Sequence, residues 1–537
     1  MVLRDVRTKV IPMPGGRKIK DGSVKVLMKL RWSLALAGLW ALEDFFIQWG
    51  AFWGKENYLH PFVYGALRLG LDVSLAVIVT MLLPRIWLGI LVILDFIFSA
   101  TVIAYAIYFH EPVSVFAVYT LKEGARVATF GVQVIPIFIW LLLLFALGMK
   151  LFLIKKIKPY SGMGRFALAG GGLMAYLLAF TILCFGSYNL RSVRKWGSSL
   201  AYGYGYPLTW FAQAMYGPNL HEIAAEVNRM RSIPHEQLNL TEPAWPVGDK
   251  IAVIQLESVG WNVINGRVNG FEIAPFLNRL IKSSRIFKVH SYHRSGSADM
   301  DFAVLSGGAP DPRTINYTIP GILYSNSLPE FMSAHGFHTV SFHGNGGSFF
   351  NRRVNFVRMG FNEIWFKDDL RDKPLKKNLW GIRDEELFQI SAEKLQSATD
   401  PQFHFLITLD SHAPFNLVRD DGNAIFPGSK DWKENYFNSM RILDAALRKY
   451  VKALPAGTLV ILYGDHTAGV NYADFRAARD GSAEYVPCIV HVCGNTNWLP
   501  AGNSPVTNYS DLRILDVTTF LRRQIELRSE RSASLNP

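Results

Sequence analysis

The sequence predicts a multi-pass α-helical membrane domain followed by an α/β domain. Three observations support this prediction. The chain of 537 residues is half hydrophobic and only 18% charged, which excludes intrinsic disorder and is unusual for a soluble protein of this size. Its apolar residues gather into long runs before about residue 190. After residue 250 they form short strand-like runs that alternate with helical patterns, so at least two separately packed units are expected.

Five apolar runs in the first part of the chain are each near the roughly 20 residues that a helix needs to cross a bilayer. They lie at about 33–52, 66–84, 86–109, 129–152 and 166–187. The first run is not expected to be a cleaved signal peptide. Its small-residue triplet at 35–37 follows Lys29 and Arg31 too closely to leave room for an apolar region before a cleavage site.

The positive charges predict the orientation of these spans. Basic residues are dense before residue 32 and between residues 150 and 165, whereas the segments 53–65 and 110–128 carry only Lys55, Lys122 and Arg126. Because cytoplasmic loops are the basic ones, the N-terminus is predicted inside, and five spans then place everything after residue 190 outside. Much of the net charge of +13 is therefore a topology signal. No nucleic-acid partner is expected, since no basic helix stands out.

Four acidic residues, Glu43, Asp44, Asp72 and Asp95, fall within or near the predicted spans. Acids inside a membrane are candidates for function, but the simpler interpretation, that they lie at helix ends or bond to neighbouring helices, is favoured. No role is assigned to them from the sequence.

A connector with a different composition follows the spans. It interleaves aromatic residues with glycine, as at a membrane–water interface, then shows a short polar helix at 221–231 and a proline-marked stretch at 241–246. The aromatic residues are Trp196, Tyr202, Tyr204, Tyr206 and Trp210. The predicted domains are thus a membrane domain at 1–190, a juxtamembrane connector at 191–248 and an extracytoplasmic domain at 249–537.

The last domain is predicted to hold a largely parallel sheet, because its strands are near-continuous apolar runs. These strands are expected at 251–256, 338–342, 403–409, 459–463 and 487–492, and helices at 274–284, 328–335, 384–396 and 435–454. Cys488 and Cys493 would point to opposite faces of the last strand, so they are not expected to pair or to share a metal ion. In such sheets, ligand chemistry gathers at the carboxyl ends of the strands.

The residues just past two of these strands have the chemistry of metal ligands. The first strand ends in Gln255-Leu256-Glu257-Ser258, and a later one in Tyr463-Gly464-Asp465-His466. Two carboxylates and an imidazole suit a divalent transition metal such as Mn²⁺ or Zn²⁺. Between them in sequence, a small-residue turn before a helical stretch exposes Ser297. A metal ion beside this hydroxyl would lower its pKa and make it a nucleophile.

Two further segments offer groups for an anion. One runs from His343-Gly-Asn-Gly-Gly to Arg352, and the other is Asp410-Ser-His412-Ala-Pro. Arginine and histidine can neutralise phosphoryl oxygens during group transfer. Singly, each feature is explained by a helix cap, a turn or an ordinary loop. Their occurrence together, in order and at strand ends, favours a site.

The order of these motifs resembles that of the lipoteichoic acid synthase type of phosphoglycerol transferase, in the alkaline phosphatase/sulfatase superfamily. Five spans ahead of the α/β domain resemble that family as well, so the likeness covers nearly the whole chain. It implies that Glu257, Ser297, Asp465 and His466 bind the metal ion, with Ser297 also the nucleophile. It further implies that Arg352, His412 and Phe350 contact the substrate.

Two positions depart from the family pattern. The nucleophile of the family is usually Thr, and Ser297 offers the same hydroxyl. The family has Trp where this chain has Phe350, which removes an N–H donor and bears on the identity of the transferred group.

The resemblance implies an enzyme of the bacterial cytoplasmic membrane with its catalytic domain outside. It would bind one divalent ion, with Mn²⁺ preferred and Zn²⁺ or Mg²⁺ as alternatives. It would move phosphoglycerol from a phosphatidylglycerol-like lipid to a polyglycerolphosphate or glycan acceptor. A phosphoethanolamine transferase is the alternative within this class, and a non-catalytic binding protein on the same fold is the alternative outside it. A sulfatase is disfavoured because the residues after Ser297 lack the Pro and Arg of the formylglycine signal.

Overall fold

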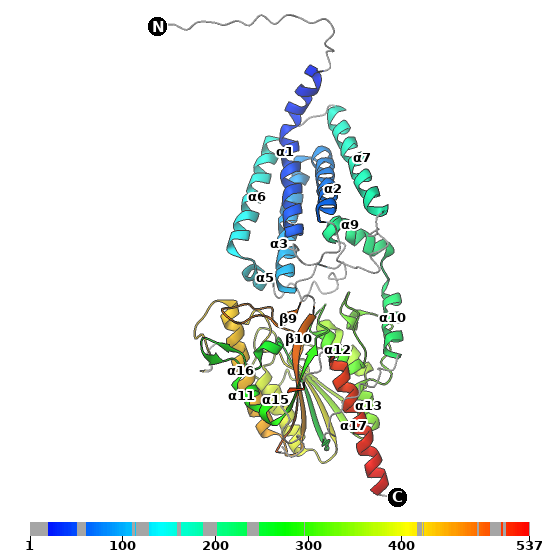
Figure 1. Cartoon of the computed structure of the whole chain (residues 1–537), viewed down its shortest axis with the longest axis vertical. Helices are drawn as coiled ribbons and strands as arrows, with labels where there is room; N and C mark the ends of the chain where they lie inside the picture. The colour runs from blue at the N-terminus through cyan, green and yellow to red at the C-terminus, as the bar shows by residue number, and fades with distance from the viewer. Residues whose placement is uncertain are drawn as a thin grey trace, which may run out of the picture. The chain divides into compact units, whose positions relative to one another are not determined.

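The computed structural model divides into two compact units, which are described separately (Figure 1). One comprises residues 1–103, 135–192 and 200–209, and the other residues 104–134, 193–199 and 210–537. The residues described are 20–50, 61–109, 113, 128–157, 163–185, 201–232, 246–294, 296–415, 422, 424–480, 483–494, 506–507 and 512–535. Most of the proline-marked stretch at 241–246, Trp196, and the loop residues Lys55, Lys122 and Arg126 lie outside them.

Long apolar helices make up the first unit. They are α1 (Lys20–Gly50), α2 (Pro61–Leu82), α3 (Arg85–Phe109), α6 (Ile137–Lys156) and α7 (Met163–Phe185), with α9 (Ala201–Tyr216) after them. Every predicted span falls on one or more helices. Among the described residues, three segments are long and apolar enough to cross a membrane: Arg85–Ile107, Ile137–Lys156 and Met163–Ile182.

The fourth predicted span, 129–152, is not one continuous helix. A short helix, α5 (Ala128–Val134), ends before Pro136, and α6 begins directly after it. Proline lacks an N–H and disfavours helical geometry in the residue before it, which explains the break at this point.

The acids predicted near the spans are engaged with two buried cations. Lys150 Nζ lies 2.6 Å from Glu43 Oε2 and 2.6 Å from Asp95 Oδ2. Arg68 Nε donates to both carboxylate oxygens of Asp72, at 2.9 and 2.8 Å, and Arg68 Nη2 lies 3.6 Å from Asp44 Oδ2. Lys150 thus joins α6 to α1 and α3, and Arg68 joins α2 to α1. Glu43, Asp44 and Asp95 therefore bond to neighbouring helices, as the simpler interpretation of the sequence predicts, whereas Asp72 pairs with Arg68 within its own helix.

The second unit is built on a mixed sheet whose central strands are parallel. Its strand order is β11-β4-β10-β8-β1-β7-β5-β6, with the short β9 paired to β10. The strands are β1 (Lys250–Leu256), β4 (Arg285–His290), β5 (His338–His343), β6 (Glu363–Phe366), β7 (Gln402–Ile407), β8 (Leu459–Gly464), β9 (Arg479–Asp480), β10 (Ala483–Val492) and β11 (Val506–Thr507). A separate small ribbon pairs β2 (Arg267–Val268) with β3 (Phe271–Glu272).

All five strands predicted from apolar runs are present. The strand predicted at 487–492 is part of β10, which runs antiparallel to β8 and to β4, while β8, β1, β7, β5 and β6 are mutually parallel. The sequence did not predict β4 and β6. β4 contains Arg285, Lys288 and His290, which interrupt its apolar pattern, and β6 is only four residues long.

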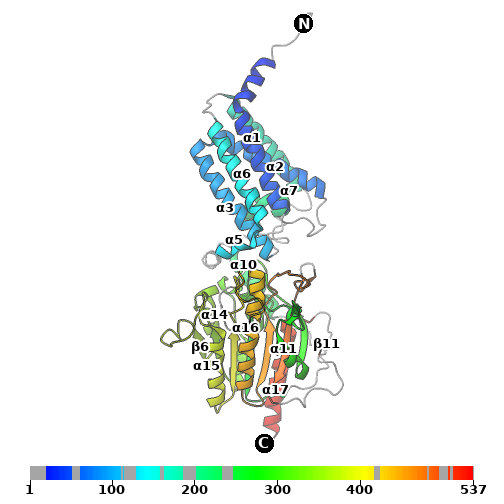
Figure 2. The ribbon, with the colours of Figure 1, turned by 90° about the vertical axis from the view of Figure 1, so that its left-hand side faces the viewer.

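Helices cover both faces of this sheet, and each face has its own core. One layer contains α11 (Pro275–Leu280), α15 (Asp384–Ser397) and α16 (Trp432–Ala453), which lie on the near side of the sheet in Figure 2. The other contains α10 (Leu220–Ser232), α12 (Ala298–Ser306), α13 (Leu328–Ala334), α14 (Arg352–Arg358) and α17 (Ile514–Leu535). This is an α/β sandwich, as the alternating pattern predicts.

The polar helix of the predicted connector, α10, is integrated into this second layer. Ile223, Ala224 and Val227 are buried in the same core as the sheet and α12. Near the end of α10, Arg231 donates from Nε and Nη2 to the carbonyl of Ser306, at 3.0 and 2.8 Å. Ser306 is the last residue of α12. The structure therefore joins α10 to the α/β unit.

Helix α12 lies entirely in the interior. Each of its nine residues, Ala298–Ser306, is buried. Its first residue follows Ser297, and its last turn ends on Gly307 in the left-handed conformation, with φ of 73°. A fully buried helix is held by packing on all sides, so both of its ends have fixed positions.

Candidate active site

Two neighbouring parallel strands, β1 and β8, bring the first pair of predicted ligands together. Leu256 pairs with Gly464 in register, so the residues that follow, Glu257 and Asp465, leave the sheet at the same edge. The Asp465 N–H donates to the carbonyl of Leu256 at 3.1 Å. The Ser258 N–H donates to Asp465 Oδ1 at 2.8 Å. The carboxyl edge of the sheet therefore fixes the backbone on both sides of the site.

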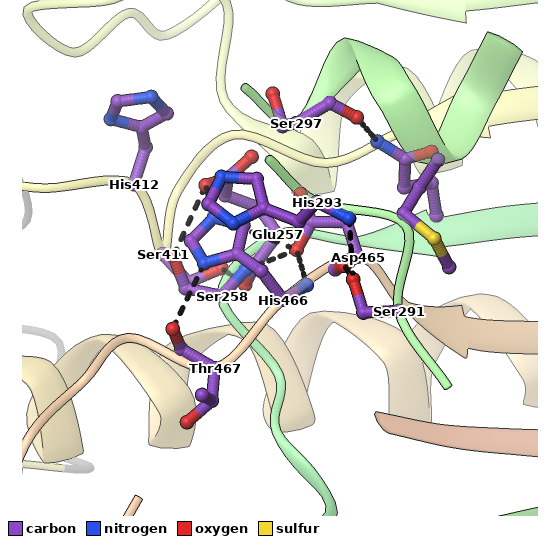
Figure 3. Close-up of polar contacts among 12 residues, drawn as sticks. Glu257, Ser258, Ser291, His293, Ser297, Ser411, His412, Asp465, His466 and Thr467 are labelled. Atoms are coloured by element: carbon purple, nitrogen blue, oxygen red, sulfur yellow. Dashed lines mark hydrogen bonds and ion pairs between the residues drawn. The ribbon is translucent and has the colours of Figure 1, made fainter. Parts of the chain in front are cut away.

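Glu257, Asp465 and His466 form a compact buried cluster at this edge (Figure 3). Each offers one ligand atom, and these atoms lie within 4.8 Å of one another. His466 Nε2 is 3.1 Å from Glu257 Oε1. Three of the four predicted metal ligands thus lie within reach of a single ion.

Hydrogen bonds around this cluster leave ligand atoms available in the direction of its centre. Asp465 Oδ1 accepts the N–H groups of Ser258 and His466, whereas Asp465 Oδ2 is buried and has no hydrogen-bond partner in the part of the chain that the structure describes. His466 Nδ1 is 3.1 Å from the carbonyl of Thr467, which can only accept, so Nδ1 carries the proton. In the neutral ring, the lone pair of Nε2 then faces a carboxylate oxygen of Glu257. A cation between these two acceptors resolves their repulsion, so the residues present fit a divalent metal ion.

Electrostatics of the cluster point to the same conclusion. Burial and the neighbouring Glu257 raise the pKa of Asp465 well above its usual range. Burial lowers the pKa of His466, but Asp465 and Glu257 outweigh this effect and raise the pKa to about 10. Without a cation the cluster would hold extra protons. A bound dication would displace them.

A second group of possible ligands shares His466 and adds His293 and Glu484, neither of which was predicted from the sequence. The rings of His293 and His466 are stacked, with centroids 4.2 Å apart and planes 17° apart. Two nearly parallel rings cannot both direct an in-plane lone pair at one ion at about 2.1 Å. We therefore assign His293 and Glu484 a supporting place beside a single metal site.

Glu484 organises this supporting group. Its Oε1 accepts the Thr467 N–H at 2.6 Å and Arg479 Nη2 at 3.2 Å, and its Oε2 lies 3.6 Å from His293 Nδ1. Burial and the neighbouring His466 lower the pKa of His293 to about 4, so the ring is neutral at pH 7. Glu484 lies in the first part of β10, before the strand predicted at 487–492, and His293 lies three residues past β4, which was not predicted. Neither residue therefore followed a predicted strand.

Ser297 lies at the start of α12, where the sequence predicts an exposed hydroxyl before a helix (Figure 3). Gln255 Nε2 donates to the Ser297 carbonyl at 3.2 Å, which ties this turn to the end of β1 two residues before Glu257. Asp299 Oδ2 accepts the N–H groups of Arg294 and Gly296, at 2.9 and 3.3 Å, and so shapes the turn. The structure thus anchors the serine turn to the strand that leads to the first predicted metal ligand, Glu257.

Arg352 begins α14 and is almost completely buried, with 2% of its surface exposed. Its Nε donates to Asp301 Oδ2 at 2.8 Å, and its Nη1 lies 3.3 Å from His343 Nε2. Its Nη2 is buried and has no hydrogen-bond partner among the described residues. Two guanidinium nitrogens are thus engaged with protein groups, which leaves Nη2 as the nitrogen available to a phosphoryl oxygen.

Phe350 lies beside this arginine, with its ring centroid 5.3 Å from Arg352 Cζ. Both Phe350 and Asn351 adopt positive φ, 51° and 59°, and this turn begins the segment that leads into α14. The unpredicted partner Asp301 is fully buried. Burial raises its pKa to about 6, although the nearby Arg352 lowers it.

His412 is held against an aromatic residue that was not predicted, Trp380. Their ring centroids are 4.2 Å apart, and both His412 Nδ1 and Trp380 Nε1 donate to the carbonyl of Ala413, at 2.8 and 2.9 Å. Phe349 also packs against Trp380, with 6.0 Å between centroids and 83° between the ring planes. The site therefore contains an indole, but its N–H is already bonded to the protein.

These features define a class of enzyme. Two carboxylates and an imidazole at the carboxyl edge of a parallel sheet, with a hydroxyl at the start of a buried helix, are suited to metal-dependent attack on a phosphate or sulfate ester. Residues 250–511 match the Sulfatase family model, so this part of the chain is a sulfatase-like domain of the alkaline phosphatase superfamily.

Curated relatives share this part of the chain. The lipoteichoic acid synthase-like protein YvgJ of Bacillus subtilis is 29% identical over 274 residues, which cover 47% of this chain and 44% of the relative. The lipoteichoic acid synthase of Staphylococcus saprophyticus is 30% identical over 230 residues, covering 40% of this chain and 35% of the relative. The chain thus matches less than half the length of either relative.

One solved structure extends the likeness to the helical part. The integral membrane protein lipooligosaccharide phosphoethanolamine transferase A of Neisseria meningitidis is 16% identical and has a TM-score of 0.50, covering 88% of this chain and 89% of that one. This likeness concerns the fold, and it confirms the predicted class: membrane helices followed by a sulfatase-like domain. The three apolar segments long enough to cross a membrane agree with the predicted membrane location.

Proposed function

We propose that this protein is a phosphoglycerol transferase that uses a phosphatidylglycerol-like lipid as donor. The carrying observation is the cluster of Glu257, Asp465 and His466, with its unpartnered Asp465 oxygen, at the edge that also holds the Ser297 turn. The names of the curated relatives, lipoteichoic acid synthases, support phosphoglycerol as the transferred group.

A divalent cation, for which we propose Mn²⁺ ahead of Zn²⁺ or Mg²⁺, would be held by Glu257, Asp465, His466 and Ser297 and would supply the positive charge that lowers the pKa of the serine hydroxyl. Ser297 Oγ then attacks the phosphorus of the donor. The new Oγ–P bond replaces the bond from phosphorus to the diacylglycerol oxygen, and diacylglycerol leaves with a proton. A phosphoglyceryl ester of Ser297 remains.

In the second step, a hydroxyl of the acceptor attacks the same phosphorus and releases Ser297. The acceptor is proposed to be a growing polyglycerolphosphate or a glycan. Arg352 Nη2, a buried donor with no protein partner, would bond a phosphoryl oxygen in both steps. His412 and Phe350 are proposed to border the head group of the donor.

Mass spectrometry of lipids incubated with the purified, metal-loaded protein tests this proposal. Release of diacylglycerol from phosphatidylglycerol, absent in Ser297→Ala, is the expected result. Release from phosphatidylethanolamine alone would establish the phosphoethanolamine transferase alternative. Absence of release from either lipid by metal-loaded protein would favour the non-catalytic binding protein.

A further inference from the structure

We propose that Asp301 is a positioning residue for phosphoryl transfer, which holds the guanidinium of Arg352 in a fixed place relative to the nucleophile. The inference rests on the proposed function, in which Arg352 binds an oxygen of the phosphoryl group that the Ser297 hydroxyl attacks. It adds a residue that neither the sequence motifs nor the metal ligands include.

The contact between Asp301 and Arg352 is buried and direct. Asp301 is 0% exposed and Arg352 is 2% exposed, and Arg352 Nε donates to Asp301 Oδ2 at 2.8 Å. A charge-assisted hydrogen bond in the interior is directional, and losing one partner strands the other charge. The carboxylate therefore restricts how the guanidinium plane can turn.

A second contact completes the hold. His343 Nδ1 lies 3.2 Å from the carbonyl of Ile407, so Nδ1 donates and the Nε2 lone pair faces Arg352. Arg352 Nη1 approaches this Nε2 at 3.3 Å. With Nε and Nη1 occupied, the remaining nitrogen, Nη2, is the unpartnered buried donor. Asp301 and His343 together leave one nitrogen free for an anion.

The position of Asp301 in the sequence links this hold to the nucleophile. Ser297 has helical backbone angles, φ −57° and ψ −23°, and directly precedes α12, so Ser297 and Asp301 are four residues apart in helical geometry. Residues four apart lie on one helix face with a rise of about 6 Å. Arg352 comes from a segment 51 residues later. The bond to Asp301 therefore fixes the position of the Arg352 guanidinium relative to the start of α12, where the Ser297 hydroxyl lies.

Binding of inorganic phosphate to the full-length, Mn²⁺-loaded protein tests the proposal, because phosphate reports on the anion site without assuming a donor lipid. Calorimetry would compare the wild type, Asp301→Ala, Arg352→Ala and the double variant. We expect Asp301→Ala to weaken phosphate binding about tenfold or more. We expect the double variant to bind no more weakly than Arg352→Ala, since Asp301 has nothing to position once the guanidinium is gone.

Two further variants control for folding. Asp311→Ala removes another buried carboxylate paired with an arginine, Arg313, whose Nε lies 2.8 Å from Asp311 Oδ1. It should lower the melting temperature and leave phosphate affinity unchanged. Asp301→Asn keeps an acceptor oxygen in place and should bind phosphate better than Asp301→Ala. If Asp301→Ala does not fold, Asp301→Glu decides, because the longer side chain keeps the pair but displaces the guanidinium.

Wild-type phosphate affinity in folded Asp301→Ala or Asp301→Glu would overturn the proposal. So would a double variant whose loss equals the product of the two single losses, which is the result of a purely structural role. Failure of the proposed function has a different signature: phosphate binding follows the expected pattern, yet metal-loaded wild-type protein releases no diacylglycerol from phosphatidylglycerol.

Discussion

The imidazole ring of His293 lies flat against that of His466, with 4.2 Å between the centroids and 17° between the planes. The same Glu484 carboxylate that faces His293 also accepts the N–H of Thr467, directly after His466. The ring of His466, a proposed metal ligand, is thus packed on one face against a second ring. The Glu484 carboxylate beside that second ring also holds the backbone that follows His466.

We predict that His293→Ala weakens Mn²⁺ binding by about 10- to 100-fold, because outer groups that orient a ligand contribute that much to metal affinity. Titration calorimetry with the metal-free protein measures the change. His290→Ala is the matched control, since the His290 ring packs against Tyr485, with centroids 4.6 Å apart, and belongs to neither group of possible ligands. Equal affinities in all three proteins would remove the supporting role of His293.

Asp465→Asn is expected to lose both bound metal and turnover. In metal-free protein its melting temperature should equal or exceed that of the wild type, because the substitution removes a buried carboxylate that lies beside Glu257. In the wild type, added Mn²⁺ should raise the melting temperature, and in the variant it should not. Metal analysis and thermal melts check both parts. An active Asp465→Asn free of metal would contradict the mechanism.

Ser297→Ala should abolish turnover, whereas Ser297→Thr should retain a measurable fraction, because threonine supplies the same hydroxyl. Mass analysis of quenched wild-type protein should find a glycerol-phosphate adduct on the peptide that contains Ser297. Full activity in Ser297→Ala would show instead that water or the acceptor attacks the donor directly.

The buried face of α10 predicts that the α/β domain needs this helix. A fragment of residues 218–537 should melt at a higher temperature than one of residues 246–537. The shorter fragment loses the burial of Ile223 and Val227, about 1–2 kcal/mol each, and leaves the Ser306 carbonyl without Arg231. Equal melting temperatures would show that α10 contributes nothing to the stability of the domain.

The C-terminus is predicted to lie outside the cytoplasm. A reporter enzyme that works only outside should therefore be active when it is fused after the last residue. The distribution of Lys and Arg predicts an N-terminus inside, and the apolar runs predict five spans. A matched pair of reporters, one active only inside the cytoplasm and one active only outside it, shows on which side of the membrane the C-terminus lies. Activity of the inside reporter at this position would rule out five spans.

Local pattern was enough to predict the parts of the fold that local physics determines. Unbroken apolar runs gave β1 and β8, and their carboxyl ends gave Glu257, Asp465 and His466 as neighbours. The pattern did not give β4, whose charged residues Arg285 and Lys288 interrupt the apolar run. A single proline broke the fourth predicted span into α5 and α6, an effect that hydropathy averaged over a window does not register.

The unpredicted site residues share one property: each acts through a partner far away in the sequence. Asp301 bonds Arg352 across 51 positions, and Trp380 bonds the carbonyl of Ala413 across 33. Their own neighbours in sequence carry no sign of these bonds. Such residues emerge only when the sheet brings distant strand ends together, because the partner and not the local pattern defines the role.

The complete burial of α12 has a consequence for how the domain fluctuates. Amide hydrogens in a helix without an exposed residue exchange with solvent chiefly when the surrounding structure opens cooperatively. The amides of Ala298–Ser306 are therefore expected among the slowest to exchange in the domain. The proposed catalytic serine is attached to a segment that does not fray by itself, so the motions that admit a lipid and release a product must belong to other parts of the molecule.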